Sequence, residues 1–352
     1  MTRPCVLFRV DVSSEMGMGH LMRCRAIAEA VVDCGGEAFF AMVSSMPVVV
    51  DMMAAIPARW TRLAGPANSQ ADLSGLINWM HQHQPRITVL DGYHFSDAYH
   101  RAVAQEGALA VIWDAADRQA VPSDVIIDSS PNAPVQTYAE ISPSACLLTG
   151  PLYALIRRDI RQASRESRVP LAKRNEVLLS FGGSDPLNLS MAVLPELSKR
   201  LPLGVDISVL AGAAYPHVDA LKAMAEHLGS KRRINVHFHP PSVVPIFCAS
   251  GLVVSAGGGT IGELVALSLP ALSVIVANNQ VTSSQDGPYP CIDGRLPNAA
   301  SLIAEHAVSL WQDLPKRERM VQNLHSLVDG EGALRVAKAL LLTRFLGRPI
   351  HA

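Results

Sequence analysis

A histidine ends a glycine-containing loop near the start of the chain, shortly after the apolar run 5–10. The segment 11–20 reads DVSSEMGMGH, and Gly17 and Gly19 would let main-chain amides approach a ligand. Histidine ordinarily titrates close to neutral pH, so His20 could take a proton from a water molecule. A histidine that caps the loop or binds phosphate without proton transfer is the alternative. The glycine spacing is not GxGxxG, so a dinucleotide site is not indicated.

Two further glycine loops follow apolar runs in the second half of the chain. Segment 181–186 reads FGGSDP and segment 255–263 reads SAGGGTIGE. Main-chain N–H groups in such loops can wrap a diphosphate, and Glu263, one helical turn after Thr260, could accept hydrogen bonds from ribose hydroxyls. A tight turn needed for packing would explain one such loop, but two in one half of the chain favour a nucleotide. The candidate nucleotide contacts are Gly182, Gly183, Ser184, Gly257, Gly258, Gly259, Thr260 and Glu263.

Polar residues also stand where apolar runs of the first half end. Asp91 and Tyr93 follow one such run, and Asp114 follows the next. Because the carboxyl ends of parallel strands face the ligand crevice of a sheet, these side chains could bind sugar hydroxyl and acetamido groups or orient His20. Each carboxylate could equally cap a helix.

Charged residues flank His20 along the chain. Arg23 lies one helical turn after it and could pair with Glu15 or reach a phosphate. Asp11 directly follows the first apolar run, and it could fix the loop or hydrogen-bond His20.

Short apolar runs alternate with helix-like stretches along the chain, which is typical of parallel sheets covered on both faces. A charge-rich stretch at 157–175 divides these runs into two sets. We therefore expect two Rossmann-like, doubly wound α/β domains facing a cleft: residues 1–158, a linker at 159–174, and residues 175–332. Residues 333–352 would form a helix that packs back across the domains, with a basic membrane-surface helix as the alternative. The expected strands are 5–10, 36–42, 87–90, 109–113, 124–127, 176–181, 205–210, 234–238, 252–255 and 271–276.

The composition fits a globular protein, with 49% hydrophobic and 17% charged residues. A net charge of −1 and 5% aromatic residues indicate no surface for nucleic acid. The cysteines form no CxxC pair, and His237 and His239 have no third ligand in view, so we expect reduced thiols, no metal and no cofactor. No apolar run reaches the roughly 20 residues that span a bilayer. We expect a cytoplasmic protein; its oligomeric state stays open and a monomer is compatible with the sequence.

Five short motifs, in this order, resemble a known family. They are GMGHLMR at 17–23, DAADR at 114–118, GPLYALIR at 150–157, SFGGSDP at 180–186, and GGGT at 257–260 followed by Glu263. As a set they are similar to the UDP-2,4-diacetamido-2,4,6-trideoxy-β-L-altropyranose hydrolases of pseudaminic acid synthesis and to related spore-coat polysaccharide proteins. These proteins are similar in turn to the GT-B glycosyltransferase that makes lipid II of peptidoglycan.

The resemblance implies a GT-B fold, with UDP held by the C-terminal domain and the sugar in the cleft. Water would replace UDP at the anomeric carbon with inversion, and His20 would be the general base, without a metal. The diphosphate and ribose contacts would fall on Gly183, Ser184, Gly258, Gly259, Thr260 and Glu263, and Asn279 and Gln280 complete the candidate set.

The chain departs from the family pattern after Gln280. Segment 281–290 reads VTSSQDGPYP where the family has an Asn/Ala-rich helix start. This loop would lie near the sugar or the uridine, so the sugar and the reaction stay open here. One alternative is a glycosyltransferase, in which an acceptor hydroxyl replaces water and for which the apolar stretch 46–56 keeps a lipid or polysaccharide acceptor open. The other is a non-catalytic nucleotide-sugar-binding protein.

Overall fold

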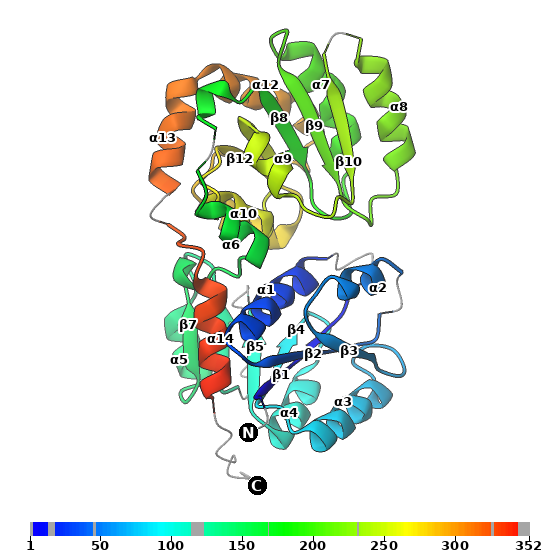
Figure 1. Cartoon of the computed structure of the whole chain (residues 1–352), viewed down its shortest axis with the longest axis vertical. Helices are drawn as coiled ribbons and strands as arrows, with labels where there is room; N and C mark the ends of the chain where they lie inside the picture. Colours follow the sequence, from blue (N-terminus) through cyan, green and yellow to red (C-terminus); the bar gives the residue numbers. More distant parts are fainter. Residues whose placement is uncertain are drawn as a thin grey trace. The chain divides into compact units, whose positions relative to one another are not determined.

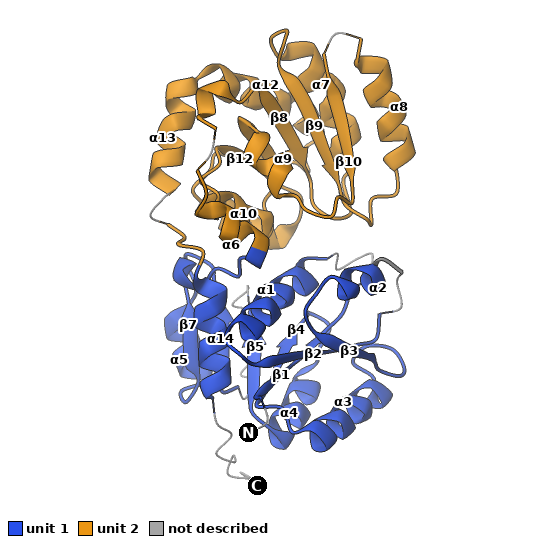
Figure 2. Ribbon diagram, in the orientation of Figure 1, with its two compact units in different colours: residues 1–158, 331–352 blue, residues 159–330 orange. Residues whose placement is uncertain are grey.

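The computed structural model describes residues 3–12, 18–44, 47–113, 123–167, 169–230, 232–324 and 327–343. The chain divides into two compact units (Figure 2). Unit 1 comprises Met1–Arg158 and Glu331–Ala352, and unit 2 comprises Asp159–Gly330. Each unit contains its own sheet of parallel strands with helices packed on it.

Unit 1 is built on seven strands in the order β3-β2-β1-β4-β5-β6-β7 (Figure 1). The chain therefore starts in the middle of the sheet and winds outwards in both directions. The central strands are buried along nearly their whole length, as expected for a parallel sheet covered on both faces. The strands are β1 (Cys5–Val10), β2 (Glu37–Met42), β3 (Arg59–Arg62), β4 (Ile87–Asp91), β5 (Leu109–Ile112), β6 (Val125–Asp128) and β7 (Cys146–Thr149).

Helices connect these strands and cover the two faces of the sheet. One face packs on α1, together with α14 from the end of the chain, and the other packs on α3 and α4. The helices of unit 1 are α1 (Gly19–Asp33), α2 (Pro47–Ala54), α3 (Gln70–His83), α4 (Asp97–Glu106), α5 (Val135–Ile141), α14 (Gly332–Leu342) and the short 3₁₀ helix η1 (Pro151–Tyr153).

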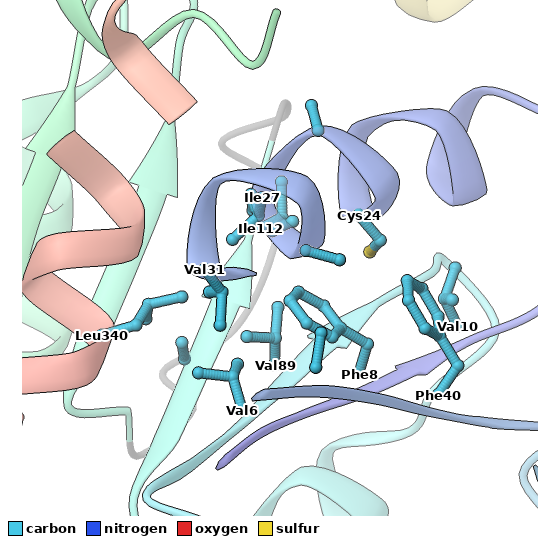
Figure 3. Packing of buried hydrophobic residues seen from close by; sticks show 14 of the residues in the cluster. Val6, Phe8, Val10, Cys24, Ile27, Val31, Phe40, Val89, Ile112 and Leu340 are labelled. Atoms are coloured by element: carbon cyan, nitrogen blue, oxygen red, sulfur yellow. The ribbon is translucent and has the colours of Figure 1, made fainter. Parts of the chain in front are cut away.

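The core of unit 1 follows from the alternation of side chains along β1. Val6, Phe8 and Val10 point to the α1 side, where the Phe8 and Phe40 rings stack with centroids 4.9 Å apart (Figure 3). Leu340 of α14 joins the same cluster. Leu7 faces the other layer. The body of the unit is therefore a rigid support for the loops at the strand ends.

Unit 2 repeats the architecture with six strands in the order β10-β9-β8-β11-β12-β13 (Figure 1). The strands are β8 (Glu176–Ser180), β9 (Asp206–Ala211), β10 (Ile234–Phe238), β11 (Leu252–Ala256), β12 (Ala271–Ile275) and β13 (Cys291–Asp293). The helices are α6 (Arg158–Ser164), α7 (Leu189–Arg200), α8 (Val218–Leu228), α9 (Val244–Ala249), α10 (Thr260–Ala266), α11 (Val281–Gln285), α12 (Ala299–Gln312) and α13 (Leu314–Leu324), with 3₁₀ helices η2 (Leu171–Lys173) and η3 (Asn278–Gln280).

Two doubly wound parallel sheets confirm the expected α/β fold class. Within 159–174, where we expected a linker, α6 buries Ile160 and Ala163. The C-terminal helix α14 packs on α1 and β1 of unit 1. In the part of the chain that the structure describes, no helix has the length and apolar character needed to cross a bilayer.

Candidate functional site

His20 lies in the first turn of α1, just beyond the carboxyl end of β1, and is 6% exposed. Its partner comes from the neighbouring strand, because β1 and β4 pair in parallel with Val10 opposite Asp91. The two side chains meet, with His20 Nδ1 2.7 Å from Asp91 Oδ1. Adjacent strand ends thus bring together residues that are far apart in the sequence.

The charges of Asp91 and Arg23 both lie close to Nδ1 of His20. Burial raises the pKa of Asp91, but the charge of Arg23 and hydrogen bonds from Arg23 and His20 outweigh it and hold the pKa well below its ordinary value. Arg23 Nη2 also lies 3.0 Å from His20 Nδ1 and can only donate. The Asp91 contact is the shorter of the two, at 2.7 Å, and an ionised carboxylate can only accept, so we assign the proton to His20 Nδ1. The lone pair of the ring is then on Nε2, which makes Nε2 the basic atom.

Arg23 binds both oxygens of Asp91. Its Nε atom donates to Oδ2 at 2.6 Å and its Nη2 atom donates to Oδ1 at 2.5 Å. The thiol of buried Cys24 lies 3.5 Å from Oδ2. The structure therefore places Arg23 on the carboxylate that orients His20, and Glu15, the other partner considered from the sequence, lies outside the described residues.

Tyr93 supplies an exposed aromatic ring beside His20. The two rings meet edge to face, with centroids 4.8 Å apart and planes at 80°, and Tyr93 is 45% exposed. Gly19 is exposed at the start of α1, where an added Cβ would meet no atom within 4 Å. The expected sugar contacts Gly17 and Asp114 lie outside the described residues and stay predictions.

The second glycine loop follows β8 in unit 2. Gly182 has φ +86°, a backbone conformation that glycine adopts without strain. The next residue, Gly183, lies against Gly212, which follows β9: a Cβ at Gly212 would overlap the main chain of Gly183. Asp185 closes the loop, because its carboxylate accepts the N–H groups of Leu189 and Ser190 at 2.8 and 2.7 Å in α7.

The third glycine loop follows β11, the strand next to β8 in the sheet. Gly257 donates to Val274 O at 2.8 Å, and a Cβ at Gly257 would overlap Ser284 Oγ of α11. Among the described residues, the following N–H groups of Gly258, Gly259 and Thr260 have no main-chain acceptor. These donors and the half-buried Thr260 hydroxyl at the start of α10 form a row suited to an anion, and the half-buried Glu263 side chain lies in the same first turn, where it can accept hydrogen bonds.

Gln280 in η3 faces this third loop. Its Oε1 atom accepts the N–H of Val276 at 3.0 Å, and a Cβ built on Gly258 would lie 3.6 Å from its Nε2 atom. The bond to Val276 fixes the amide, so its N–H groups are directed to the glycine loop. Asn279 lies next to it on the same 3₁₀ turn and is exposed.

A hollow of about 840 Å³ in unit 1 lies away from these groups. It is lined by residues at the amino ends of the strands, such as Cys5, Glu37 and Arg86. Ligands of open parallel sheets bind at the carboxyl ends instead, where His20 lies. Within the described ranges, no group of three or more His, Cys, Asp or Glu side chains is arranged to hold a metal ion.

Comparison with known proteins adds evidence on the family. No family model matches the chain. It is 21% identical over 280 residues to the UDP-2,4-diacetamido-2,4,6-trideoxy-β-L-altropyranose hydrolase of Campylobacter jejuni, covering 79% of this chain and 94% of that protein. This match confirms the resemblance read from the motifs. The chain resembles this hydrolase family.

Two further matches are a curated transferase and a solved structure. It is 30% identical over 167 residues to the UDP-N-acetylglucosamine–N-acetylmuramyl-(pentapeptide) pyrophosphoryl-undecaprenol N-acetylglucosamine transferase of Exiguobacterium, covering 45% of this chain and 40% of that protein. The structure of MurG from Acinetobacter baumannii superposes with a TM-score of 0.66 at 12% identity, covering 97% of this chain and all of that one. The likeness confirms the GT-B fold.

Segment 281–290, which departs from the hydrolase family pattern, lies beside the third glycine loop of unit 2. It forms α11, whose buried Ser284 lies against Gly257 and 3.4 Å from Ser273 Oγ. The sequence did not single out Ser284 or Gly212 as supports of the glycine loops. Gly212 lies just beyond the end of the expected strand 205–210, and this position was the one feature of the sequence that could have drawn attention to it.

Gly212→Ala tests the expectation that the second glycine loop holds UDP. The added methyl group overlaps the main chain of Gly183, so the loop must shift, and overpacking of this kind costs about 1–3 kcal/mol. We expect the dissociation constant for UDP, measured by calorimetry, to rise about tenfold, with the His20–Asp91 pair of unit 1 unaffected. Unchanged UDP affinity would mean that the loop does not hold the nucleotide.

Proposed function

We propose that the chain is an inverting hydrolase of a UDP-linked 2,4-diacetamido-2,4,6-trideoxyhexose, with His20 activating water. The observation that carries the proposal is the contact between His20 Nδ1 and Asp91 Oδ1 at 2.7 Å, which leaves Nε2 as the base. The match to the Campylobacter hydrolase, over 79% of the chain, supports the substrate class. The free sugar would feed the synthesis of a nonulosonic acid such as pseudaminic acid.

The proposed reaction needs one base and one good leaving group. His20 Nε2 takes a proton from water while the water oxygen forms a bond to the anomeric carbon on the face opposite UDP. The bond between that carbon and the phosphate oxygen breaks, UDP leaves with the electron pair, and the sugar configuration inverts. The proton on His20 then passes to solvent. Arg23 and Asp91 keep the imidazole oriented, and Tyr93 offers its exposed ring to the sugar.

Unit 2 would hold the UDP part of the substrate. The N–H groups of Gly182–Ser184 and Gly258–Thr260 would bind the diphosphate, whose negative charge increases as the bond breaks, and donors set in advance stabilise such charge. Glu263 would accept from the ribose, and Asn279 and Gln280 would donate to the diphosphate or sugar. In this proposal main-chain and amide donors, and not a metal ion, would stabilise the leaving group.

A glycosyltransferase is the second candidate, because the chain shares 30% identity over 167 residues with the Exiguobacterium transferase. His20 would then take the proton of an acceptor hydroxyl instead of water. A lipid acceptor would need an exposed apolar group, and Val50 of α2, 45% exposed, is one such residue in unit 1.

Incubation of the protein with a panel of UDP-sugars, without any acceptor, separates these functions. The anomeric proton signal, followed by NMR, reports cleavage, stereochemistry and the preferred sugar together. The hydrolase predicts UDP and free sugar of inverted configuration. A transferase would leave the sugar uncleaved until an acceptor is added, and a non-catalytic binding protein would bind UDP saturably and release no sugar under either condition.

A further inference from the structure

A buried charge cluster lies next to the His20 pair in unit 1. Arg9 of β1 is fully buried, and its guanidinium binds Asp72 through Nε and Nη2 at 3.0 and 2.8 Å. Its Nη1 atom lies 2.6 Å from Asp11 Oδ2. Asp72 and Asp11 are 0% and 4% exposed, so two buried carboxylates share one buried guanidinium. Such a cluster has one preferred arrangement, because moving any member leaves a buried charge without its partner.

Asp11 links the cluster to three loops at the carboxyl edge of the sheet. Asp11 itself begins the loop that leads from β1 to His20. Its Oδ1 atom accepts the N–H groups of Val43 and Ser44, at 2.7 and 3.3 Å, in the loop after β2. Its Oδ2 atom lies 3.3 Å from Nε2 of His94 in the loop after β4. The Asp11 carboxylate therefore accepts hydrogen bonds from the loop after β2 and lies at an ion-pair distance from the loop after β4.

The contacts of Asp11 and Asp91 cross between the two central strands. His20, after β1, reaches Asp91 at the end of β4, whereas His94, after β4, reaches Asp11 beyond β1. Gly92 makes this possible, because a Cβ there would lie 2.6 Å from His94 Cε1. The loop can curl so that His94 turns to Asp11 while its neighbour Tyr93 packs on His20.

We infer that Asp11 is a positioning residue for the His20 base. Its Oδ1 atom accepts the main chain of the loop after β2, and its Oδ2 atom lies beside His94 in the loop that places Tyr93 on the His20 ring. Asp11 does not touch His20, so it acts only through these loops. This inference rests on the proposed function for its effect on turnover, but its effect on loop order stands independently.

Asp11→Asn tests the inference, with Asp72→Asn as the matched control. Both variants remove one carboxylate charge from Arg9, but only Asp11 contacts the three loops. Asn at position 11 can still accept from Val43, whereas its NH₂ group faces the donors of Arg9 and His94. We expect kcat for sugar release to fall about tenfold in Asp11→Asn, since small misplacement of a base is costly. KM and the UDP dissociation constant should change by less than about twofold.

Hydrogen exchange measured by mass spectrometry gives a readout besides activity. Residues 18–23 and 92–95 should exchange faster in Asp11→Asn than in Asp72→Asn, even where the two variants unfold at the same temperature. The inference is overturned if both variants lower kcat equally, or if exchange in these segments is the same in both. If the wild-type protein releases no sugar, the proposed function fails, and the exchange comparison still decides the role of Asp11.

A second variant covers the case in which Asp11→Asn does not fold. His94→Ala removes the contact between His94 and Asp11 and leaves the Arg9 cluster intact. His94 is 21% exposed, so its loss should disturb the fold less than a change at buried Asp11. It should reproduce the faster exchange at 18–23 and the loss of kcat. Wild-type exchange and kcat in this variant would overturn the link through His94.

Discussion

Replacing His20 by Asn is expected to abolish sugar release while UDP remains bound. Asparagine has no group that takes a proton near neutral pH, and a positioned base contributes about 10²–10⁴-fold to such a reaction. The groups proposed to hold UDP all belong to unit 2 and do not involve this side chain. We therefore expect kcat to fall by about that factor, measured by the anomeric proton signal, with the UDP dissociation constant from calorimetry unchanged.

His100→Asn is the matched control for this variant. His100 is also buried in unit 1, and its Nδ1 atom lies 2.9 Å from Ser96 O within α4. The same substitution there should leave kcat near the wild-type value. An equal loss of turnover and UDP affinity in His20→Asn would assign His20 a binding role in place of proton transfer.

The central strands of both sheets and the edge strand β10 could be predicted from the sequence, and the other three edge strands could not. All ten expected strands are present, whereas β3, β7 and β13 were missed. These three are edge strands in the sheet orders, and they are short and partly exposed. A strand buried on both faces reads as a continuous apolar run, but a short edge strand such as Arg59–Arg62 carries no such pattern.

The sequence predicted which site residues lie at the ends of strands, but it did not predict which of these residues contact one another. The sequence placed His20 and Asp91 at carboxyl ends, where a parallel sheet exposes its ligand groups. It could not show that β1 and β4 are neighbours, and this adjacency is what brings the two residues together. Arg23 had two possible partners by spacing alone, and the choice depends on where Asp91 lies in space.

Asp11 shows the same limit of sequence reasoning. Its position after β1 suggested a role in the loop or a bond to His20 itself. In the structure Asp11 contacts His94 and the loop after β2. The aspartate that contacts His20 is Asp91. Asp11 and Asp91 both follow an apolar run, so the sequence gives no reason to prefer either as the partner of His20. The loop conformations decide it, because they bring His20 to Asp91 and His94 to Asp11.

Asp91→Asn is expected to lower kcat as strongly as the loss of the base itself. Arg23 can only donate, so the amide oxygen of the introduced asparagine would turn to Arg23 and its NH₂ group would face His20 Nδ1. That arrangement favours the opposite tautomer, with the proton on Nε2, where the lone pair is needed. Loss of the orienting carboxylate costs on the order of 10⁴-fold in kcat in a comparable His–Asp pair. UDP affinity should stay at the wild-type value.

The stability of Asp91→Asn gives a second, independent check. Because the pKa of Asp91 is lowered on folding, its ion pair with Arg23 stabilises the protein above the ordinary carboxyl range and is lost only in stronger acid. The variant should therefore have a lower free energy of unfolding than wild type at pH 7, by about 1.5–3 kcal/mol. This difference should narrow only below about pH 4.

Asp128→Asn separates the effect on the base from the loss of any buried carboxylate. Asp128 also ends a strand, is 2% exposed, and accepts the Tyr138 hydroxyl at 2.7 Å, with Ser130 N at 2.9 Å. Its replacement should destabilise unit 1 without changing the tautomer of His20, which ¹⁵N-histidine NMR reports directly. If Asp91→Asn retained the Nδ1–H tautomer and wild-type kcat, the carboxylate would be structural, and the base would be oriented by Arg23 and Tyr93 alone.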